Sequence, residues 1–160
     1  MHLTVYIASQ EIVLHEKGGK RRVYSVSTAS RGTGQQEGSW QTPLGQHVIR
    51  AKIGAGLPAN SVFVGRRFTG EIFSPGLCQQ YPERKDWILT RILWLSGLEP
   101  GYNRLGNVDT MRRYIYIHGS PDTAVMGEPG SRGCIRMHGE DIIDLFDRVD
   151  TGTRIDILLS

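Results

Sequence analysis

The chain has 160 residues, of which 39% are hydrophobic and 22% are charged, so it is long enough to bury one core and has the composition of a globular domain. Its formal net charge is +3, and 15 of its 19 basic residues are arginines scattered along the chain, which excludes the dense basic surface of a nucleic-acid-binding protein. No apolar run of about 18 residues occurs, so we expect no membrane segment.

The N-terminal residues MHLTVYIASQEIVLHE have no basic region, long apolar stretch or small-residue cleavage site of an export signal. We therefore expect a cytoplasmic protein, or a periplasmic or cell-wall protein if a leader has been removed. With only two cysteines, Cys78 and Cys134, the chain has no disulfide framework, which fits a reducing compartment. The sequence carries no pattern that specifies an oligomeric state.

Short β-type runs open the chain. We predict strands at Leu3 to Ala8, Ile12 to His15 and Val23 to Ser27, with the second and third joined into a hairpin by Lys17-Gly18-Gly19-Lys20. Residues 27–45, STASRGTGQQEGSWQTPLG, are too polar for a core and predict a long loop. A long loop in a compact domain is more often functional than idle.

The middle of the chain predicts further strands, at residues 47–51, 61–63, 88–95 and 113–118. The segments between them, 65–86 and 96–112, are rich in Gly, Pro and polar residues and predict excursions over the sheet rather than a second domain. Because side chains alternate along a strand, Tyr114, Tyr116 and His118 should share one face, with His118 at the strand end.

One segment near the C-terminus predicts a helix. Its apolar residues repeat every 3.6 positions, its first turn is acidic, and Gly139 is the expected N-cap; the apolar set is Ile142, Leu145, Phe146 and Val149. A last strand is expected over Thr153 to Leu158. Together these elements predict a single domain over residues 1–160, mostly β, with mixed sheets and one short helix.

The stretch GSRGCIR, residues 130–136, has the chemistry of a nucleophile site. A cysteine nucleophile needs a base, oxyanion donors and a group that orients the base. Gly133 permits a backbone that aims consecutive N–H groups at one oxyanion, and His118 lies 16 residues before Cys134. The Gly119 carbonyl is the nearest group that could orient the imidazole, and Arg136 could bind a substrate carboxylate bidentately.

Simpler interpretations remain open from the residues alone. Cys134 could be a packed small apolar residue, which is the expected role of Cys78. Zinc binding is disfavoured because no C-x-x-C or H-x-x-x-H spacing is present, and we predict neither a metal nor another cofactor. Trp40 and Tyr116 could line a cleft, although aromatic residues of a β protein more often lie in the core.

The segments His118-Gly119 and Ser131-Arg132-Gly133-Cys134-Ile135-Arg136 resemble the signature of the L,D-transpeptidase (YkuD-type) catalytic domain. Upstream, Val26-Ser27-Thr28 and Thr42-Pro43-Leu44-Gly45 resemble two further segments of that family, so the resemblance covers about residues 3–158. The resemblance implies a β-rich sandwich-like fold with a short helix after the cysteine, and a flap over the cleft within about residues 52–112.

The resemblance also implies the roles of individual residues. It makes Cys134 the nucleophile, His118 its base and Gly119 the residue whose carbonyl orients that base, with Gly133 and Cys134 as oxyanion donors. Substrate-binding positions are Ser131, Arg132, Arg136 and Tyr116. Arg132 departs from the many relatives that carry a second histidine there, which places the substrate contacts at that position in question.

By the same resemblance, the substrates are peptidoglycan stem peptides or muropeptides, cleaved between the diamino acid and the terminal D-Ala through an acyl-enzyme. Transfer to water gives an L,D-carboxypeptidase, which we prefer because a cytoplasmic enzyme would meet soluble recycled muropeptides. Transfer to an amine gives 3-3 cross-links. The alternatives of other classes are a muropeptide-binding module without catalysis and a different cysteine amidase or peptidase on the same fold.

Overall fold

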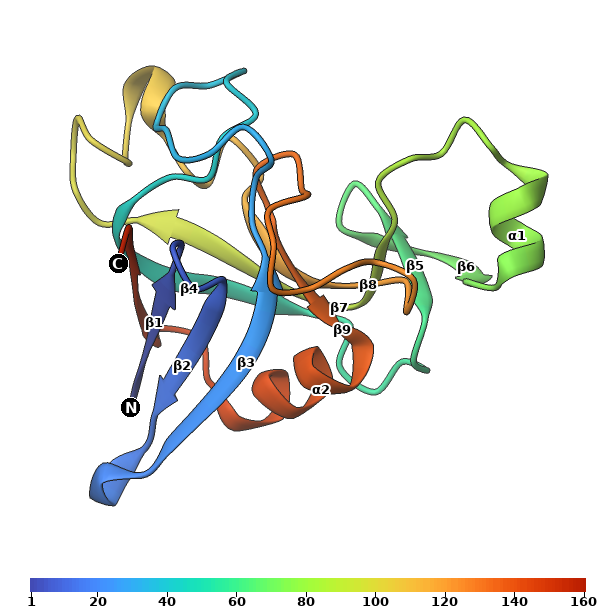
Figure 1. Ribbon diagram of the computed structural model, residues 1–160, viewed down its shortest axis with the longest axis horizontal. Coiled ribbons are helices and arrows are strands. Elements are labelled where there is room, and N and C mark those ends of the chain that lie inside the picture. The colour runs from blue at the N-terminus through green and yellow to red at the C-terminus, as the bar shows by residue number, and fades with distance from the viewer.

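The computed structural model describes residues 1–160 and is built mainly of strands (Figure 1). The strands are β1 (His2–Tyr6), β2 (Glu11–His15), β3 (Arg21–Ser27), β4 (Gly45–Ile53), β5 (Ser61–Val64), β6 (Arg67–Ile72), β7 (Ile88–Gly97), β8 (Tyr116–Ser120), β9 (Ile135–His138) and β10 (Arg154–Leu158). The helices are α1 (Pro75–Gln80) and α2 (Gly139–Arg148), with short 3-10 turns η1 (Lys17–Gly19) and η2 (Gly106–Val108). None of these helices has the length and hydropathy needed to cross a membrane.

The sheet closes on itself, which corrects the expected sandwich-like arrangement. Its strand order is β4-β10-β1-β2-β3-β9-β8-β7, and β7 pairs again with β4 to complete a barrel-like ring. Closure is possible because β7 is 10 residues long and pairs with β8 along one edge and with β4 along the other. Most pairs are antiparallel, whereas β1 with β10 and β8 with β9 are parallel, so the sheet is mixed as predicted.

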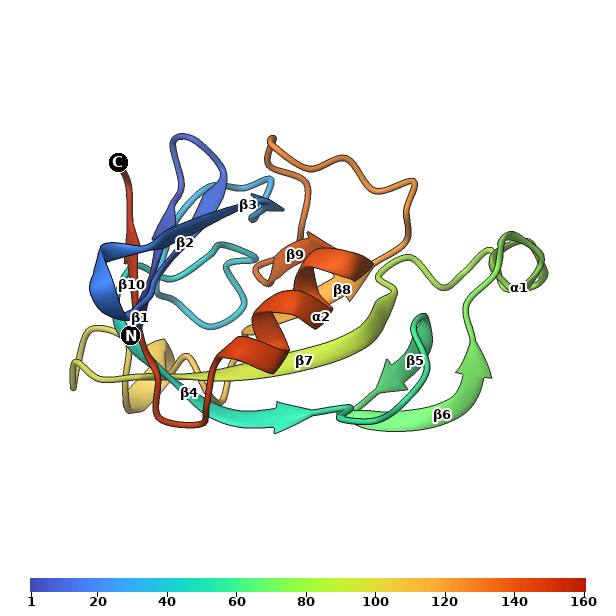
Figure 2. The same cartoon turned by 90° about the horizontal axis from the view of Figure 1, so that it is seen from below.

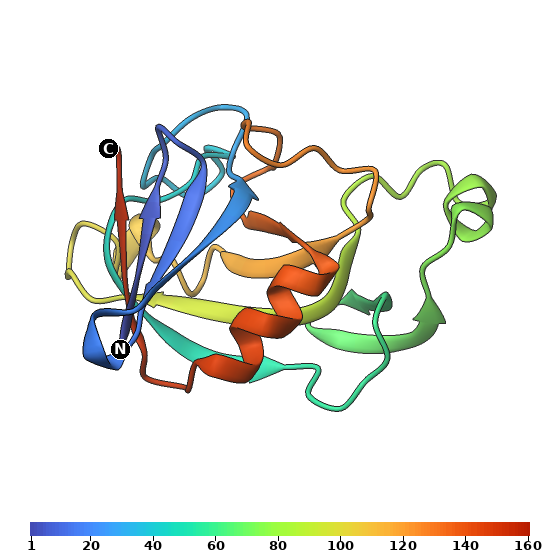
Figure 3. The ribbon, with the colours of Figure 1, turned by 60° about the horizontal axis from the view of Figure 1, so that its bottom comes forward.

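The main core lies between the closed sheet and α2. It is a cluster of 19 buried residues that includes Ile142, Leu145 and Phe146 from one face of the helix, as the periodicity predicted. The helix packs against β7, β8 and β9 (Figure 2; Figure 3). It begins at Gly139 with His138 as its N-cap, one residue before the expected cap, and so follows directly from β9.

Residues 61–87, here called the extension, project from the barrel and hold β5, β6 and α1 (Figure 1). Strand β5 pairs with β7 only at Val62 with Leu89 and Phe63 with Ile88, and β6 pairs only with β5. Neither β6 nor α1 has a buried residue. The extension is therefore attached to the barrel through a short length of backbone pairing.

Most predicted strands are confirmed, and so is the hairpin turn, where Gly18 and Gly19 take φ values of 80° and 81° that favour glycine. The expected single helix is wrong, because α1 forms as well, and β6 and β9 were not predicted. Strand β8 begins at Tyr116 instead of residue 113 and continues to Ser120. Tyr114 lies outside it with a φ of 57°, so it does not continue the face of the strand.

Candidate active site

Residues Ser131–Cys134 form a tight turn, here called the nucleophile turn, directly before β9. Gly133 has a φ of 129°, which a residue with a side chain rarely adopts. The buried Ser131 hydroxyl donates to the Cys134 carbonyl and accepts from the Gly133 N–H at 3.2 Å. Ser131 therefore holds the turn together from inside.

Two upstream segments support this turn. Thr42 Oγ1 donates to the Gly133 carbonyl at 2.9 Å and accepts from the Ala29 N–H at 3.0 Å. The Ser131 N–H donates to the Thr28 carbonyl at 2.9 Å. The two segments that resemble family motifs, 26–28 and 42–45, thus have a physical role, because they fix the backbone on both sides of the cysteine.

His118 lies in β8, and Cys134 is the residue directly before the neighbouring parallel strand β9. His118 is in register with Arg136, two residues after Cys134. His118 is 0% exposed, and its Nδ1 lies 2.6 Å from the Gly119 carbonyl, the orienting group predicted from the sequence. A side chain at Gly119 would place Cβ 2.5 Å from the Leu89 carbonyl, so only glycine fits there.

With its Nδ1 proton donated to Gly119, His118 presents Nε2 as a base. Nε2 is buried and has no hydrogen-bond partner. The Cys134 thiol is instead held by the start of β8, since Sγ donates to the Tyr114 carbonyl at 3.4 Å and accepts from the Tyr116 N–H at 3.3 Å. No hydrogen bond joins the thiol to the unpartnered Nε2 in this structure.

The resting pair is neutral. Burial raises the pKa of the Cys134 thiol to about 12, and the hydrogen bond from the Tyr116 N–H and the guanidinium groups of Arg136 and Arg113 oppose this shift without overcoming it. Burial also lowers the pKa of His118 below its ordinary value of 6.5, against the smaller opposing effect of Asp86. At neutral pH the site therefore holds a thiol beside an imidazole, and the thiolate forms only when the proton moves to Nε2.

An oxyanion donor is available beside the sulfur. Of the two expected donors, the Gly133 N–H is occupied by Ser131 Oγ, whereas the Cys134 N–H has no acceptor in the structure. The Cys134 N–H is therefore the free group that could stabilise negative charge on a substrate carbonyl oxygen.

The expected substrate-binding residues have separate locations. Arg136 forms an ion pair with Asp86 at 3.0 Å and donates to the Gly130 carbonyl at 3.0 Å. The Arg132 guanidinium lies 5.9 Å from the centre of the Trp40 ring. Tyr116 is only 4% exposed and packs in a small cluster with Phe63 and Ile92, so its side chain does not line an open cleft.

Two residues of the extension reach this site and were not singled out from the sequence. Asp86 pairs with Arg136, as described above. Arg66 donates to the Tyr116 hydroxyl at 3.0 Å and stacks on the Tyr114 ring with 4.6 Å between guanidinium and ring centre. Arg66 therefore contacts both residues whose backbone groups hold the thiol. No local pattern marks either residue, because the contacts join segments far apart in the sequence.

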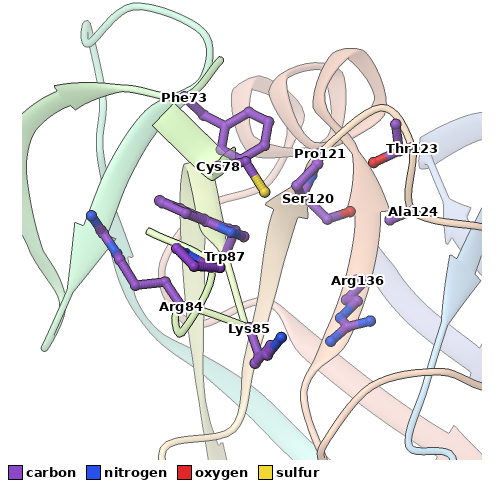
Figure 4. Close-up of a pocket in the computed structure, with 11 residues that line it drawn as sticks. Phe73, Cys78, Arg84, Lys85, Trp87, Ser120, Pro121, Thr123, Ala124 and Arg136 are labelled. Carbon is purple, nitrogen blue, oxygen red and sulfur yellow. The ribbon is translucent and has the colours of Figure 1, made fainter. Parts of the chain in front are cut away.

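A pocket of about 310 Å³ lies between the extension and the β8–β9 face (Figure 4). Phe73, Lys85 and Trp87 come from the extension, and Ser120 and Arg136 from the strands. Cys78 also lines this pocket and packs with Trp87, whereas Cys134 packs with the cluster around Phe63. No group of three or more His, Cys, Asp or Glu residues is arranged to hold a metal ion.

Comparison with known proteins shows the fold and the family of the chain. YkuD of Bacillus subtilis (strain 168) is 44% identical over 46 residues, which are 29% of this chain and 28% of YkuD. The structure of a cysteine-to-serine variant of an Enterococcus faecium L,D-transpeptidase superposes with a TM-score of 0.57 at 15% identity, over 98% of this chain and 49% of the other. The structure of LdtMt1, an L,D-transpeptidase solved with imipenem, superposes with a TM-score of 0.55 at 15% identity, over 98% of this chain and 57% of the other.

These solved structures establish a shared fold, and this chain spans about half of their length. The sequence profile of the L,D-transpeptidase catalytic domain, called YkuD, matches residues 1–157, nearly the whole chain. The chain therefore belongs to the YkuD family of L,D-transpeptidase catalytic domains.

Proposed function

We propose that this protein cleaves the bond between the diamino acid and the terminal D-Ala of peptidoglycan tetrapeptides through an acyl-enzyme on Cys134. The observation that carries the proposal is the unpartnered Nε2 of buried His118, fixed by Gly119 on the strand next to the one that Cys134 precedes. A buried imidazole nitrogen without a partner is costly unless it has a role. Family membership supports the class of reaction and of substrate.

The chemistry uses groups of this chain only. His118 Nε2 takes the Sγ proton as Sγ bonds to the carbonyl carbon of the diamino acid, and the Cys134 N–H donates to the oxyanion. The tetrahedral intermediate collapses, the carbon–nitrogen bond breaks, and the imidazolium gives its proton to the leaving D-Ala nitrogen. The product of this half-reaction is a thioester. The acceptor then gives its own proton to His118, bonds to the same carbon and releases the thiol, which recovers that proton.

We further propose that water is the acceptor, so that the product is a tripeptide. Hydrolysis requires only that water reach the thioester, and Cys134 is partly exposed. Cross-linking requires in addition that the amine of a second stem peptide be bound next to the thioester, and it is the second candidate because relatives of this family are named for that reaction.

The test is incubation of the purified protein with disaccharide tetrapeptide, followed by mass analysis. We expect the tripeptide and free D-Ala, whereas a peptide dimer would show cross-linking. Cys134→Ser should give no tripeptide and no thioester-linked peptide on the protein. Cys78→Ser should still form the thioester at Cys134, because Cys78 packs in a different cluster. An unchanged tetrapeptide with the Cys134 thiol intact would exclude both reactions.

A muropeptide-binding module is the candidate of another class, favoured by the neutral thiol that is held by Tyr114 and Tyr116 instead of His118. Imipenem, the ligand in the LdtMt1 structure, separates the two. An enzyme should gain the mass of the carbapenem at Cys134, because acylation uses the same proton transfer. A binding module should remain unmodified.

A further inference from the structure

A group of arginines surrounds one exposed tryptophan beside the nucleophile turn. Two hollows meet there, of about 430 Å³ and about 230 Å³, and both are lined by Trp40 and Arg132. Arg31 lines the first hollow and Arg112 the second. We call these four residues, Arg31, Trp40, Arg112 and Arg132, the Trp40 shelf.

The arginines of the shelf have no anionic partner. None of the guanidinium groups of Arg31, Arg112 and Arg132 makes an ion pair or a hydrogen bond within the chain, whereas Arg84, Arg136 and Arg148 each pair with a carboxylate. Glu37, the one acid that lines either hollow, forms no ion pair. Positive charges held close together repel one another and lower the stability of the folded chain slightly, unless an anion binds between them. A carboxylate suits this place, because a guanidinium can bind it through two hydrogen bonds.

Trp40 is held outward by its backbone. The residue is 50% exposed and has a φ of 60°, a left-handed conformation that is uncommon for a residue with a side chain. The loop around it is fixed, because Arg113 Nη2 donates to the Gln41 carbonyl at 2.6 Å and the Gln41 N–H donates to Ser39 Oγ at 3.3 Å. An apolar ring kept exposed by a fixed loop, with a guanidinium 5.9 Å from its centre, is a preformed surface for a ligand.

The shelf borders the nucleophile turn through Arg132 and shares no lining residue with the pocket of Figure 4. Arg132 lies within the nucleophile turn, two residues before Cys134, while Arg136 follows two residues after and faces the extension. An extended peptide acylated at Cys134 could therefore have one end over the β8–β9 face and the other over the shelf.

We propose that the Trp40 shelf binds a free carboxylate of the substrate that belongs to neither residue at the cleaved bond, with the adjoining aliphatic portion packed on Trp40. In a stem peptide this carboxylate is that of the glutamyl residue preceding the diamino acid. The proposal rests on the proposed function, and it predicts that the site discriminates acidic stem peptides from amidated ones.

The test uses two tetrapeptides that differ only in whether the glutamyl carboxylate is free or amidated. Wild type should show a kcat/KM about tenfold higher for the acid, which corresponds to one charge-assisted hydrogen-bonded pair at a partly exposed site. Arg132→Gln should bring this ratio close to one, whereas Trp40→Ala should lower kcat/KM for both peptides, because they share the aliphatic portion. Arg67→Gln, which removes an exposed arginine of the extension, is the matched control and should keep the full ratio.

Binding separates failure of this proposal from failure of the proposed reaction. On a Cys134→Ser background, calorimetry should show tighter binding of the acid than of the amide, and Arg132→Gln should remove the difference. If wild type cleaves neither peptide while this binding preference persists, the proposed reaction is wrong and the carboxylate site on the Trp40 shelf is supported. If wild type cleaves or binds both forms equally well, the shelf is not a carboxylate site.

Discussion

The two sides of the site are held in different ways. On the barrel side, the nucleophile turn is fixed by buried polar contacts from Ser131, Thr42 and Thr28, and His118 by a backbone carbonyl. On the other side, the extension reaches the site through the ends of two partly exposed side chains, Arg66 and Asp86, carried by a segment with little backbone pairing to the barrel. The barrel therefore fixes the reacting groups, and the extension adjusts their surroundings.

The largest expected effect comes from the barrel side. His118→Ala should lower kcat/KM by about 10²- to 10⁴-fold, because it removes the proton acceptor for the thiol. The wild-type rate should hold at neutral pH and fall only well below pH 6.5, since burial lowers the pKa of His118 and only the neutral imidazole accepts a proton. Activity measured against pH should show this acidic decline in the wild type and lack it in His118→Ala.

A smaller effect should follow from weakening the support of the nucleophile turn. Thr42→Val leaves the Gly133 carbonyl and the Ala29 N–H without their buried partner, which should cost about 1–3 kcal/mol of unfolding free energy. Thr69→Val, in exposed strand β6, is the matched control and should change stability by less than about 0.5 kcal/mol. Urea denaturation measures both, and equal losses would contradict the contrast between the two regions.

Arg66 tests whether the extension positions the thiol. Arg66→Ala should reduce kcat/KM about fivefold, because Tyr114 and Tyr116 lose the group that contacts them both, and a single charged hydrogen bond at a partly exposed site is of that size. The acidic decline with pH should stay in place because His118 is untouched. Arg66→Lys, which keeps a donor to Tyr116, should recover most of the rate, and Arg67→Ala should have no effect. A loss equal in Arg66→Lys and Arg66→Ala would argue against positioning through that hydrogen bond.

The sequence predicts the barrel side well, because its elements have local patterns. Alternating or continuous apolar runs mark the first three strands and the 3.6-residue repeat marks α2, and the buried residues follow those patterns. The contact of His118 with the Gly119 carbonyl was predicted from the sequence and is confirmed, whereas the pairing of His118 with Cys134 in catalysis stays a prediction. Ring closure was missed because it depends on the second edge of β7, which leaves no mark in the local sequence.

The extension side could not be predicted in the same way. Strand β6, Arg67–Ile72, has no buried residue and therefore no apolar alternation, and α1 has only six residues, fewer than two helical turns. Strand β9 is four residues long and runs directly into α2. The contacts of Arg66 with Tyr116 and of Asp86 with Arg136 join residues 50 apart in sequence, so only the folded chain reveals them.

Asp86→Asn should give the smallest effect, at the one ion pair that joins the extension to the barrel. Freed from Asp86, Arg136 can interact with a substrate carboxylate, so KM should fall about two- to threefold, the size of a partly exposed ion pair. The same change removes a negative charge that raises the pKa of His118 against the dominant effect of burial, so the acidic decline in rate should move to lower pH. Asp122→Asn removes one negative charge from the neighbouring loop and should shift neither quantity. If the two variants behave alike, Asp86 does not restrain Arg136, and the extension acts on the site through Arg66 alone.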